Sequence, residues 1–501
     1  MTAPVPTEIE LKLALPPAQV ARFLRLMARR RPPTRQSLVT RYYDTPAFEL
    51  AGLGVALRLR RVGRRWIQTL KTEGTRGGGL SRREEYESAV ARGALDWSRF
   101  PPAAQARVPA GLRPALGVAF ETRFERSAWQ IEARDGTRIE VALDVGEVRA
   151  GRRREPICEI ELELKSGSPD ALFVLAQAWS ARLDCLPLDV SKAERGVRLA
   201  HGEARAPARS MPPGLEPDDD AATGFAAICQ ACLAQFQANL PGVLYDDDIE
   251  YVHQARVALR RLRAALRLFR DAVALPEPLA GSLRALAAAL GPARDWDVLC
   301  AETLPAMAAA YPQPLDWQRG SAVLEARRLE VRTTMRAALL AARPGAWLLG
   351  FQRWLLQRGW RAAPQARRLL QMSPLDDYAR RALDKGHRRI VRRARRFARL
   401  DANGRHALRI VAKRQRYAVE FFQPLFADCR RAAYPAALRD LQDTLGRSND
   451  AQVAAALLAT HAQDAGAMGA FALGWLAALR AQPDAAAAVP LRHFMKCRPC
   501  W

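Results

Sequence analysis

Two segments carry charged residues at a spacing that could hold a metal ion. The pattern Glu-x-Glu-x-Lys occurs in residues 8–12, and it returns far along the chain in residues 159–165, which read Glu-Ile-Glu-Leu-Glu-Leu-Lys. Strict alternation predicts a strand with one apolar face and one charged face at each place. Like charges on one strand face repel, whereas a divalent cation held between carboxylates removes that repulsion. We therefore expect a metal site on these two strands.

Five further segments alternate charged and apolar residues in the same way. They are residues 55–60, 66–71, 83–87, 120–126 and 139–144. Any one of them alone is typical of an amphipathic strand with a solvated face. If helices such as residues 16–30 cover the apolar faces, however, the charged faces must turn into a closed sheet with a polar bore. Carboxylates in that bore suit a hard cation and arginines suit phosphate, so the pattern predicts a tunnel for a metal and a polyphosphate.

Length and composition indicate more than one domain. The chain has 501 residues, 49% of them apolar, which is too long for one hydrophobic core. Residues 203–219 form a charged, proline-rich linker without periodicity. We expect a strand-rich α+β domain over residues 1–202, an all-α domain over 220–490 and a tail over 491–501.

The net charge of +26 indicates a polyanionic partner. The first residues lack the basic and apolar regions of a secretory signal, and the longest uncharged apolar run, residues 465–479, is too short to cross a bilayer. A buried helix suits that run better, and no membrane partner is expected. Eight cysteines in so long a chain do not indicate a disulfide scaffold, so we expect a reducing cytoplasmic location.

Two Cys-x-x-Cys pairs leave two readings open. The first is Cys229 with Cys232, and the second is Cys497 with Cys500. They could together bind zinc, or they could be small residues on helices. The second reading is favoured, because the pairs lie far apart and no further ligand is required by the sequence.

The helical half contains an internal repeat. His253, Arg256, Arg260 and Arg263 have the same spacing as His406, Arg409, Lys413 and Arg416, and a Leu-Gly pair follows each set at 290–291 and 445–446. The repeat predicts a duplicated four-helix bundle with pseudo-symmetric halves.

Both copies place cations in a stripe along one helix. Residues 388–416 also contain twelve Lys or Arg residues and a single acid, Asp401. A solvated basic face is the simple explanation for such a run, but crowding of this kind costs repulsion that a polyanion would relieve. No carboxylate or cysteine stands at i+4 from either histidine, so phosphate binding is favoured over metal binding.

The charged motifs of the first half resemble those of the CYTH domain, the triphosphate tunnel metalloenzyme family. The resemblance runs through the motifs at 8–12, 42–45, 57–60, 69–71, 83–87, 159–165 and 191–196, in the family's order. It implies an eight-stranded antiparallel β tunnel that binds triphosphates with Mg²⁺ or Mn²⁺.

The same resemblance implies roles for individual residues. The implied metal ligands are Glu8, Glu10, Glu159, Glu161 and Glu163. The implied phosphate ligands are Lys12, Arg58, Arg60, Lys71, Arg83, Arg123, Arg126, Lys165, Lys192 and Arg195. Tyr42 and Lys71 match positions with catalytic roles in thiamine triphosphatases, although a core aromatic and a simple phosphate ligand are open alternatives. Arg123 and Arg126 have opposite strand parity, so both point inward only if a bulge intervenes.

The histidine-headed repeat resembles the CHAD domain, the conserved histidine α-helical domain, over about residues 220–490. That resemblance implies two four-helix bundles that bind inorganic polyphosphate through His253, Arg256, Arg260, Arg263, His406, Arg409, Lys413 and Arg416.

Together the two halves predict a cytoplasmic inorganic triphosphatase that cleaves tripolyphosphate, tethers longer polyphosphate chains and associates with polyphosphate granules. The alternatives are a non-catalytic polyphosphate-binding protein that targets granules, a thiamine triphosphatase and an adenylate cyclase. Nucleic acid is a disfavoured partner, because no base-stacking or groove-reading motif accompanies the basic stripes.

Overall fold

The computed structural model divides into two compact units. One comprises Met1–Ala206 with Arg343–Gln357, and the other comprises Pro207–Ala342 with Arg358–Trp501. The structure describes residues 6–91, 93–362, 374–426, 429, 432–481 and 485–501. Within that described part, no helix is long and apolar enough to cross a membrane.

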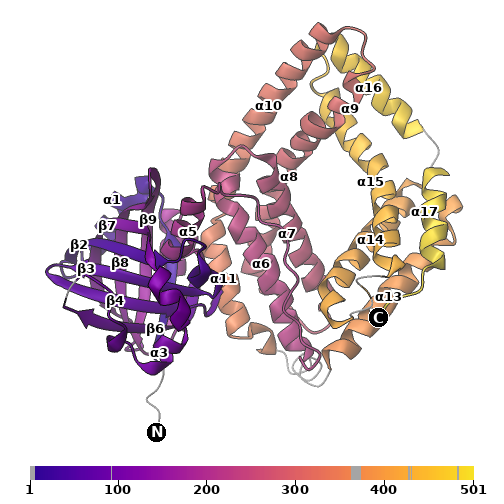
Figure 1. Cartoon of the computed structure of the whole chain (residues 1–501). Coiled ribbons are helices and arrows are strands. Elements are labelled where there is room, and N and C mark those ends of the chain that lie inside the picture. Colours follow the sequence, from indigo (N-terminus) through magenta and orange to yellow (C-terminus); the bar gives the residue numbers. More distant parts are fainter. Residues whose placement is uncertain (1–5, 92, 363–373, 427–428, 430–431, 482–484) are drawn as a thin grey trace. The chain divides into compact units, whose positions relative to one another are not determined.

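Eight antiparallel strands of the first unit form a closed barrel (Figure 1). Their order is β1-β9-β8-β7-β2-β3-β4-β6, and β6 pairs back with β1. Short strands β5 and β10 add to β6 and β1. The strand bounds are β1 Thr7–Ala14, β2 Thr34–Asp44, β3 Val55–Val62, β4 Arg65–Thr72, β5 Thr75–Gly77, β6 Leu80–Val90, β7 Gly117–Glu132, β8 Arg138–Ala150, β9 Arg153–Ser166 and β10 Leu186–Pro187. The predicted eight-stranded tunnel is confirmed.

Apolar residues on the outer face of the barrel form its main core. Leu11, Leu13 and Leu162 are fully buried there, because helices α1 (Val20–Met27) and α4 (Asp170–Leu183) pack over the strands. The shorter helices of this unit are η1 Pro17–Gln19, α2 Glu49–Gly52, η2 Trp97–Arg99, α3 Pro102–Ala106, η3 Ala110–Ala115 and α5 Lys192–His201. With the apolar faces turned outward onto helices, the charged faces line the bore.

Helix α11 (Pro344–Leu356) belongs to the barrel unit although it lies far along the sequence. It packs against α4 and β10. Its Leu349 is fully buried in the barrel core, and its Arg353 forms a two-pronged ion pair with Asp170 at 2.6 and 2.7 Å. This unit is therefore built from two separate stretches of chain.

The second unit is helical, and its packing repeats. Helices pack in the order α6, α7, α8 and α10, and again in the order α13, α14, α15 and α16, with α17 also on α15. The histidine-headed stripes lie on α7 and α14, which contact each other. The bounds are α6 Ala221–Tyr245, α7 Ile249–Leu268, α8 Glu277–Val298, η4 Leu299–Thr303, α9 Pro305–Ala308, α10 Pro314–Ala341, η5 Gly359–Ala362, α13 Leu375–Ala394, η6 Phe397–Arg399, α14 Ala402–Phe422, η7 Gln423–Leu425, α15 Ala433–Ala459, α16 Gly466–Ala481 and α17 Ala485–Lys496.

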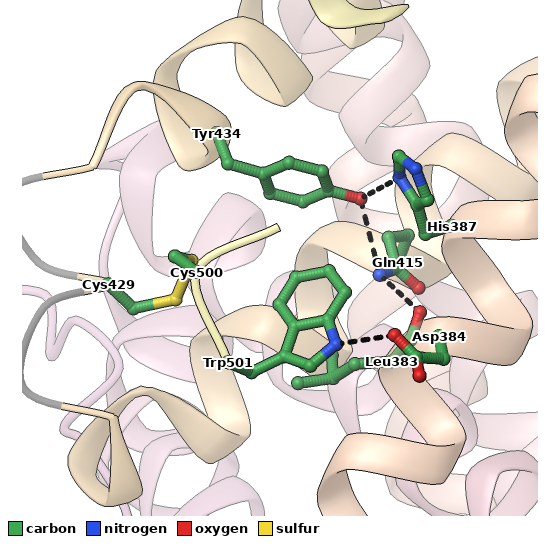
Figure 2. Close-up of a disulfide and its surroundings, with 8 residues drawn as sticks. All are labelled: Leu383, Asp384, His387, Gln415, Cys429, Tyr434, Cys500 and Trp501. Atoms are coloured by element: carbon green, nitrogen blue, oxygen red, sulfur yellow. Dashed lines mark hydrogen bonds between the residues drawn. A yellow bond between two sulfur atoms is a disulfide. The ribbon is translucent and has the colours of Figure 1, made fainter. Parts of the chain in front are cut away.

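A disulfide joins Cys429 to Cys500 in the helical unit (Figure 2). Beside it, Trp501 packs edge-on against Tyr434 and donates a hydrogen bond from Nε1 to Asp384 at 2.8 Å. The sequence spacing of the cysteines does not predict this link. Cys229 and Cys232 are free and buried on α6. Cys500 instead has a covalent partner, Cys429, which the zinc interpretation did not include.

Candidate active site and basic helical face

Strand register brings the acidic residues of the tunnel together. The β1–β9 pairing places Glu10 opposite Glu163 and Lys12 opposite Glu161. The β8–β9 pairing places Asp144 opposite Glu159. Because side chains on neighbouring strands at paired positions lie on the same face, three strands contribute carboxylates to one wall of the bore.

Asp144, Glu159 and Glu161 form the tightest carboxylate group. They can offer oxygen atoms that all lie within 4.8 Å of one another, and no other group of metal-type ligands is as close within the described residues. The Nζ atom of Lys192 contacts all three, at 2.7, 2.5 and 2.8 Å. Three hard oxygen donors that already surround one positive charge are a donor set that fits a divalent cation.

Asp144 was not among the ligands predicted from the sequence. It is fully buried, and it also accepts a hydrogen bond from Arg126 at 2.8 Å. The sequence did contain a sign of this inward position, because Asp144 alternates with apolar residues on the strand 139–144 as Glu140 does. A single acid on an alternating strand carries too little information to stand out, and only the pairing with Glu159 reveals it.

Glu8 and Glu10 form a second acidic group on β1. Lys71 contacts both carboxylate oxygens of Glu8 at 2.6 and 2.8 Å, and Arg83 pairs with both glutamates. Burial opposes ionisation of Glu8, but Lys71 and Arg83 outweigh it and lower the pKa of that carboxyl. Both predicted ligands of β1 therefore stay charged within the tunnel wall.

The predicted residues Glu163 and Lys165 lie in a more open place. Their side chains are 32% and 38% exposed and pair with each other at 2.7 Å. Burial raises the pKa of Glu163, because its one close cation only partly offsets the lost hydration. This pair is thus less tightly held than the carboxylate group around Lys192.

Among the described residues, one arginine on the cationic wall of the tunnel forms no ion pair. Arg58 lies 3.4 Å from Glu85, and Arg126 pairs with Asp144 and Glu161. Arg60, in contrast, makes no ion pair within the described residues and donates only to the Thr40 hydroxyl at 3.1 Å. Burial, together with Arg58 and Arg126, lowers the pKa of Arg60 to about 10. We therefore expect the Arg60 guanidinium to stabilise a bound anion more strongly than the arginines that already have acidic partners.

A cavity of about 260 Å³ joins these acidic and basic walls. The predicted site residues that line it are Glu8, Glu10, Lys12, Tyr42, Arg58, Arg60, Lys71, Arg83, Arg126, Glu161, Glu163, Lys165 and Lys192. Glu159 and Arg195 are buried behind the wall, where they pair at 3.1 Å. Arg195 also donates a hydrogen bond to Glu155, so it stabilises the wall from its outer side and does not line the cavity.

Arg123 is the exception among the predicted phosphate ligands. Its side chain is 49% exposed and pairs with Glu121 outside the bore. No bulge interrupts β7 between Arg123 and Arg126 in its pairing with β8, so strand parity sends the two arginines to opposite faces. Arg126 takes the inward position.

Helix α5 positions Lys192 at its first turn. Ser191 caps the helix and forms a reciprocal capping box with Glu194, which fixes where the helix begins. Gly196 then allows close packing, because a β-carbon there would overlap the ring of Phe120. The cap and the glycine together direct Lys192 into the three carboxylates.

Tyr42 and Lys71, the predicted catalytic pair, both border the tunnel cavity and a neighbouring one of about 450 Å³. The Tyr42 ring stacks on Phe120 at 4.6 Å between centroids, and only 5% of the residue is exposed. The Lys71 Nζ also lies 3.0 Å from Glu85. Tyr42 is therefore a packed wall residue, whereas the Lys71 ammonium lies among the carboxylates.

In the helical unit, the two basic stripes meet. Lys413 of α14 has Arg260 and Arg256 of α7 among its charged neighbours, as well as Arg409 and Arg416. Burial and these arginines lower the pKa of Lys413 to about 7. The name basic helical face is used below for His253, Arg256, Arg260, Arg263, His406, Arg409, Lys413 and Arg416.

Each half of the basic helical face repeats one ion pair. Arg256 lies 3.7 Å from Asp295, and the equivalent Arg409 lies 3.5 Å from Asp450. Burial, and then the nearby Arg294, lower the pKa of His253. The internal repeat thus places equivalent cations on one continuous face.

Comparisons with known proteins agree with both halves. The family model of the CYTH domain matches residues 6–197, and that of the CHAD domain matches residues 227–459. The chain therefore carries a CYTH domain followed by a CHAD domain, as predicted from its motifs.

Individual relatives match one half or the other. The chain is 35% identical over 201 residues to an inorganic triphosphatase of Haemophilus influenzae, a match that covers 38% of this chain and 54% of that protein, so it spans about half the relative's length. It is 33% identical to the crystal structure of the CHAD domain from Ricinus communis, covering 58% of this chain and 97% of that one with a TM-score of 0.50. A Hippeastrum protein with a dominant triphosphatase activity is 18% identical, covering 39% of this chain and 97% of that one with a TM-score of 0.31.

Proposed function

We propose that the protein is a metal-dependent inorganic triphosphatase that hydrolyses tripolyphosphate to pyrophosphate and phosphate. The observation that supports this proposal best is one cavity lined both by carboxylates and by Arg60, which forms no ion pair within the described part of the chain. A purely anion-binding tunnel gains nothing from buried carboxylates, because they repel its ligand. The match to an inorganic triphosphatase supports the same class of reaction.

The residues present suit Mg²⁺ or Mn²⁺. Asp144, Glu159 and Glu161 would hold the ion, with Glu8 and Glu10 of β1 and Glu163 of β9 as further ligands. Such an ion would neutralise charge on the phosphate oxygens and orient the phosphate chain of the substrate. Lys192 would then turn from the carboxylates toward phosphate, because the ion takes over its role.

The cationic residues of the tunnel would bind and orient the phosphate chain for in-line attack by water. Arg60 would bind the phosphate group most strongly, since among the described residues it has no ion pair that must first break. Lys71 would stabilise the negative charge that develops on the departing oxygen, while Tyr42 would orient the chain through its hydroxyl. Lys12, Arg58, Arg83, Arg126 and Lys165 complete the set, with Arg195 bracing it from behind.

A substrate panel tests this proposal. Phosphate release would be measured from tripolyphosphate, ATP, thiamine triphosphate and pyrophosphate, each with Mg²⁺ or Mn²⁺. Wild type would be compared with Glu10→Gln and with a control, Glu125→Gln, whose residue is exposed on β7. We expect Glu10→Gln to lose about a hundredfold in rate and the control to lose nothing. Equal rates for wild type and Glu10→Gln would rule out the tunnel assignment.

One observation favours an organic triphosphate as the second candidate. The neighbouring 450 Å³ cavity is lined by Tyr42, Phe120 and Val197, which could cover an apolar group attached to the phosphate chain. Faster turnover of thiamine triphosphate or ATP than of tripolyphosphate would support this candidate. No turnover with any triphosphate would leave the non-catalytic polyphosphate-binding alternative.

We also propose that the basic helical face binds inorganic polyphosphate, in the cytoplasm and at polyphosphate granules. Support comes from the meeting of the two stripes at Lys413, where like charges crowd without enough acids. Competition between polyphosphate and RNA for the full chain at fixed salt tests it. Preferential binding of RNA would contradict it.

A further inference from the structure

A second basic region of the helical unit lies in a cavity of about 450 Å³ between α7, α13 and α14. Eight arginine or lysine side chains line it, and Asp271 is the one carboxylate among its described lining residues. Arg267, Arg389, Arg392 and Arg414 are among the eight, and all four are exposed. None of the eight belongs to the basic helical face.

These cations have too few acidic partners. Arg270 and Lys385 both pair with Asp271, at 3.4 and 4.0 Å. The side chains of the other six form no ion pair or hydrogen bond within the residues that the structure describes. Burial, and then the cations Arg267, Arg270 and Arg389, lower the pKa of Arg414. The rim thus concentrates positive charge that an anion would stabilise.

The cavity is separate from the basic helical face, although both use α7 and α14. Lys413 has Arg260, Arg409, Arg416 and Arg256 as its charged neighbours. For the next residue, Arg414, the neighbouring charges that lower its pKa are instead Arg267, Arg270 and Arg389. Consecutive helical residues point about 100° apart, so the two sets of cations lie on different faces of the same helix pair.

The floor of the cavity is apolar and closely packed. Val411, Ala418 and Phe421 lie on one face of α14, at helical spacing. Beside them, Gly386 lets α13 approach α14, because a β-carbon there would overlap the amide of Gln415. That amide donates to the Leu383 carbonyl oxygen at 3.0 Å and to the Tyr434 hydroxyl at 3.4 Å (Figure 2). Close packing of α13 on α14 therefore fixes the position of this floor.

We propose that this cavity binds a phosphorylated organic molecule of nucleotide size. Arginines on the rim suit phosphate groups, since the guanidinium group binds phosphate through two parallel hydrogen bonds. The apolar floor and the volume suit an attached organic body, which an inorganic phosphate chain lacks. The proposal is independent of triphosphate hydrolysis in the tunnel.

Nucleotide binding to the full chain tests the site. The probe is adenosine 5′-(β,γ-imido)triphosphate, titrated calorimetrically in EDTA, with tripolyphosphate as the inorganic comparison. The cavity variant is Arg389→Ser with Arg414→Ser. The matched control is Arg388→Ser with Arg395→Ser, which removes two exposed charges from or next to α13 outside the cavity. Photo-crosslinking with 8-azidoadenosine triphosphate then locates the bound base.

We expect the cavity variant to weaken nucleotide binding about tenfold or more, while the control changes it less than twofold. Crosslinks should map to α13 or α14, persist in Glu10→Gln and disappear in the cavity variant. Equal weakening in both double variants would overturn the site, because it would show a general charge effect. Tripolyphosphate binding that is equally sensitive to the cavity variant and tighter than nucleotide binding would overturn the organic ligand.

Discussion

Lys192 in the tunnel contacts three carboxylates within 2.8 Å, whereas Lys413 on the basic helical face is surrounded by arginines. The two residues have the same side chain, and neither is fully exposed: Lys192 is buried and Lys413 is half-buried. Their pKa values nevertheless move in opposite directions. Despite burial, the carboxylates raise the pKa of Lys192, whereas burial and the arginines lower that of Lys413 to about 7.

The difference shows two ways in which a protein can prepare a site for an anion. The tunnel balances its charges internally, so it can fold with its cations buried and exchange one partner for another when substrate arrives. The basic helical face has fewer acids than cations near solvent, since only some of its arginines form ion pairs, so it gains most from an external anion. Arg60 of the tunnel resembles Lys413 in this respect, because neither side chain forms an ion pair within the described residues.

Removing each lysine gives the sharpest test of this contrast. Lys192→Met leaves three buried carboxylates without their shared cation, so we expect the free energy of unfolding to fall by about 3–5 kcal/mol. Lys413→Met removes a repelled charge, so we expect no loss, or a gain below about 1 kcal/mol. Urea unfolding at pH 7 in EDTA measures both. Equal losses would mean that the two environments do not differ as described.

The disulfide offers a second contrast, because it lies in the helical unit alone. Cys158 and Cys185 of the barrel unit are free. Cys429→Ser should lower the stability of the helical unit by about 2–4 kcal/mol, since the link closes a loop of 71 residues in the unfolded chain. Thermal unfolding with and without reductant should show a shift in the helical transition only. A matching shift in the barrel transition would contradict this separation.

Asp144 tests whether the balanced charges of the tunnel serve catalysis. Asp144→Asn keeps the shape but removes one of the three closely spaced carboxylates, so the rate of tripolyphosphate hydrolysis should fall about a hundredfold. The Glu125→Gln variant again serves as the control. A variant that keeps its full rate at saturating metal would remove Asp144 from the proposed ligand set.

The lowered pKa of Lys413 predicts pH-dependent polyphosphate binding. A bound polyanion favours the charged ammonium, and the free protein loses that proton above about pH 7. Affinity should therefore fall by up to about tenfold per pH unit as the pH rises from 7 to 8.5. Lys413→Arg keeps the charge, so its affinity should change little over that range. Parallel pH profiles for the two proteins would contradict the prediction.

Folding stability should show the opposite trend at the same residue. The pKa of Lys413 in the folded protein lies below the ordinary lysine value, so the unfolded chain binds more protons between about pH 7 and 10. The contribution of this residue therefore makes the protein more stable as pH rises through that window, with no anion present. The Lys413→Arg variant provides the baseline for this measurement.

Much of the tunnel could be predicted because strand alternation is a local property. It assigns Glu8, Glu10 and Glu161 to charged faces without knowledge of any partner strand. The helical repeat was readable for the same reason, since spacing along one helix decides which residues share its stripe. The confirmed eight-stranded tunnel and the helical half both follow from such local periods together with the family motifs.

Contacts between distant segments could not be predicted in this way. Strand register brought Asp144 beside Glu159 and left Arg123 outside, and packing brought α11 onto the barrel. The link between Cys429 and Cys500 is likewise non-local. The sequence by itself thus determined which side chains share a face, because that depends on the period of the backbone. Only the tertiary structure decided which faces meet, because that depends on the pairing and packing of segments far apart in the chain.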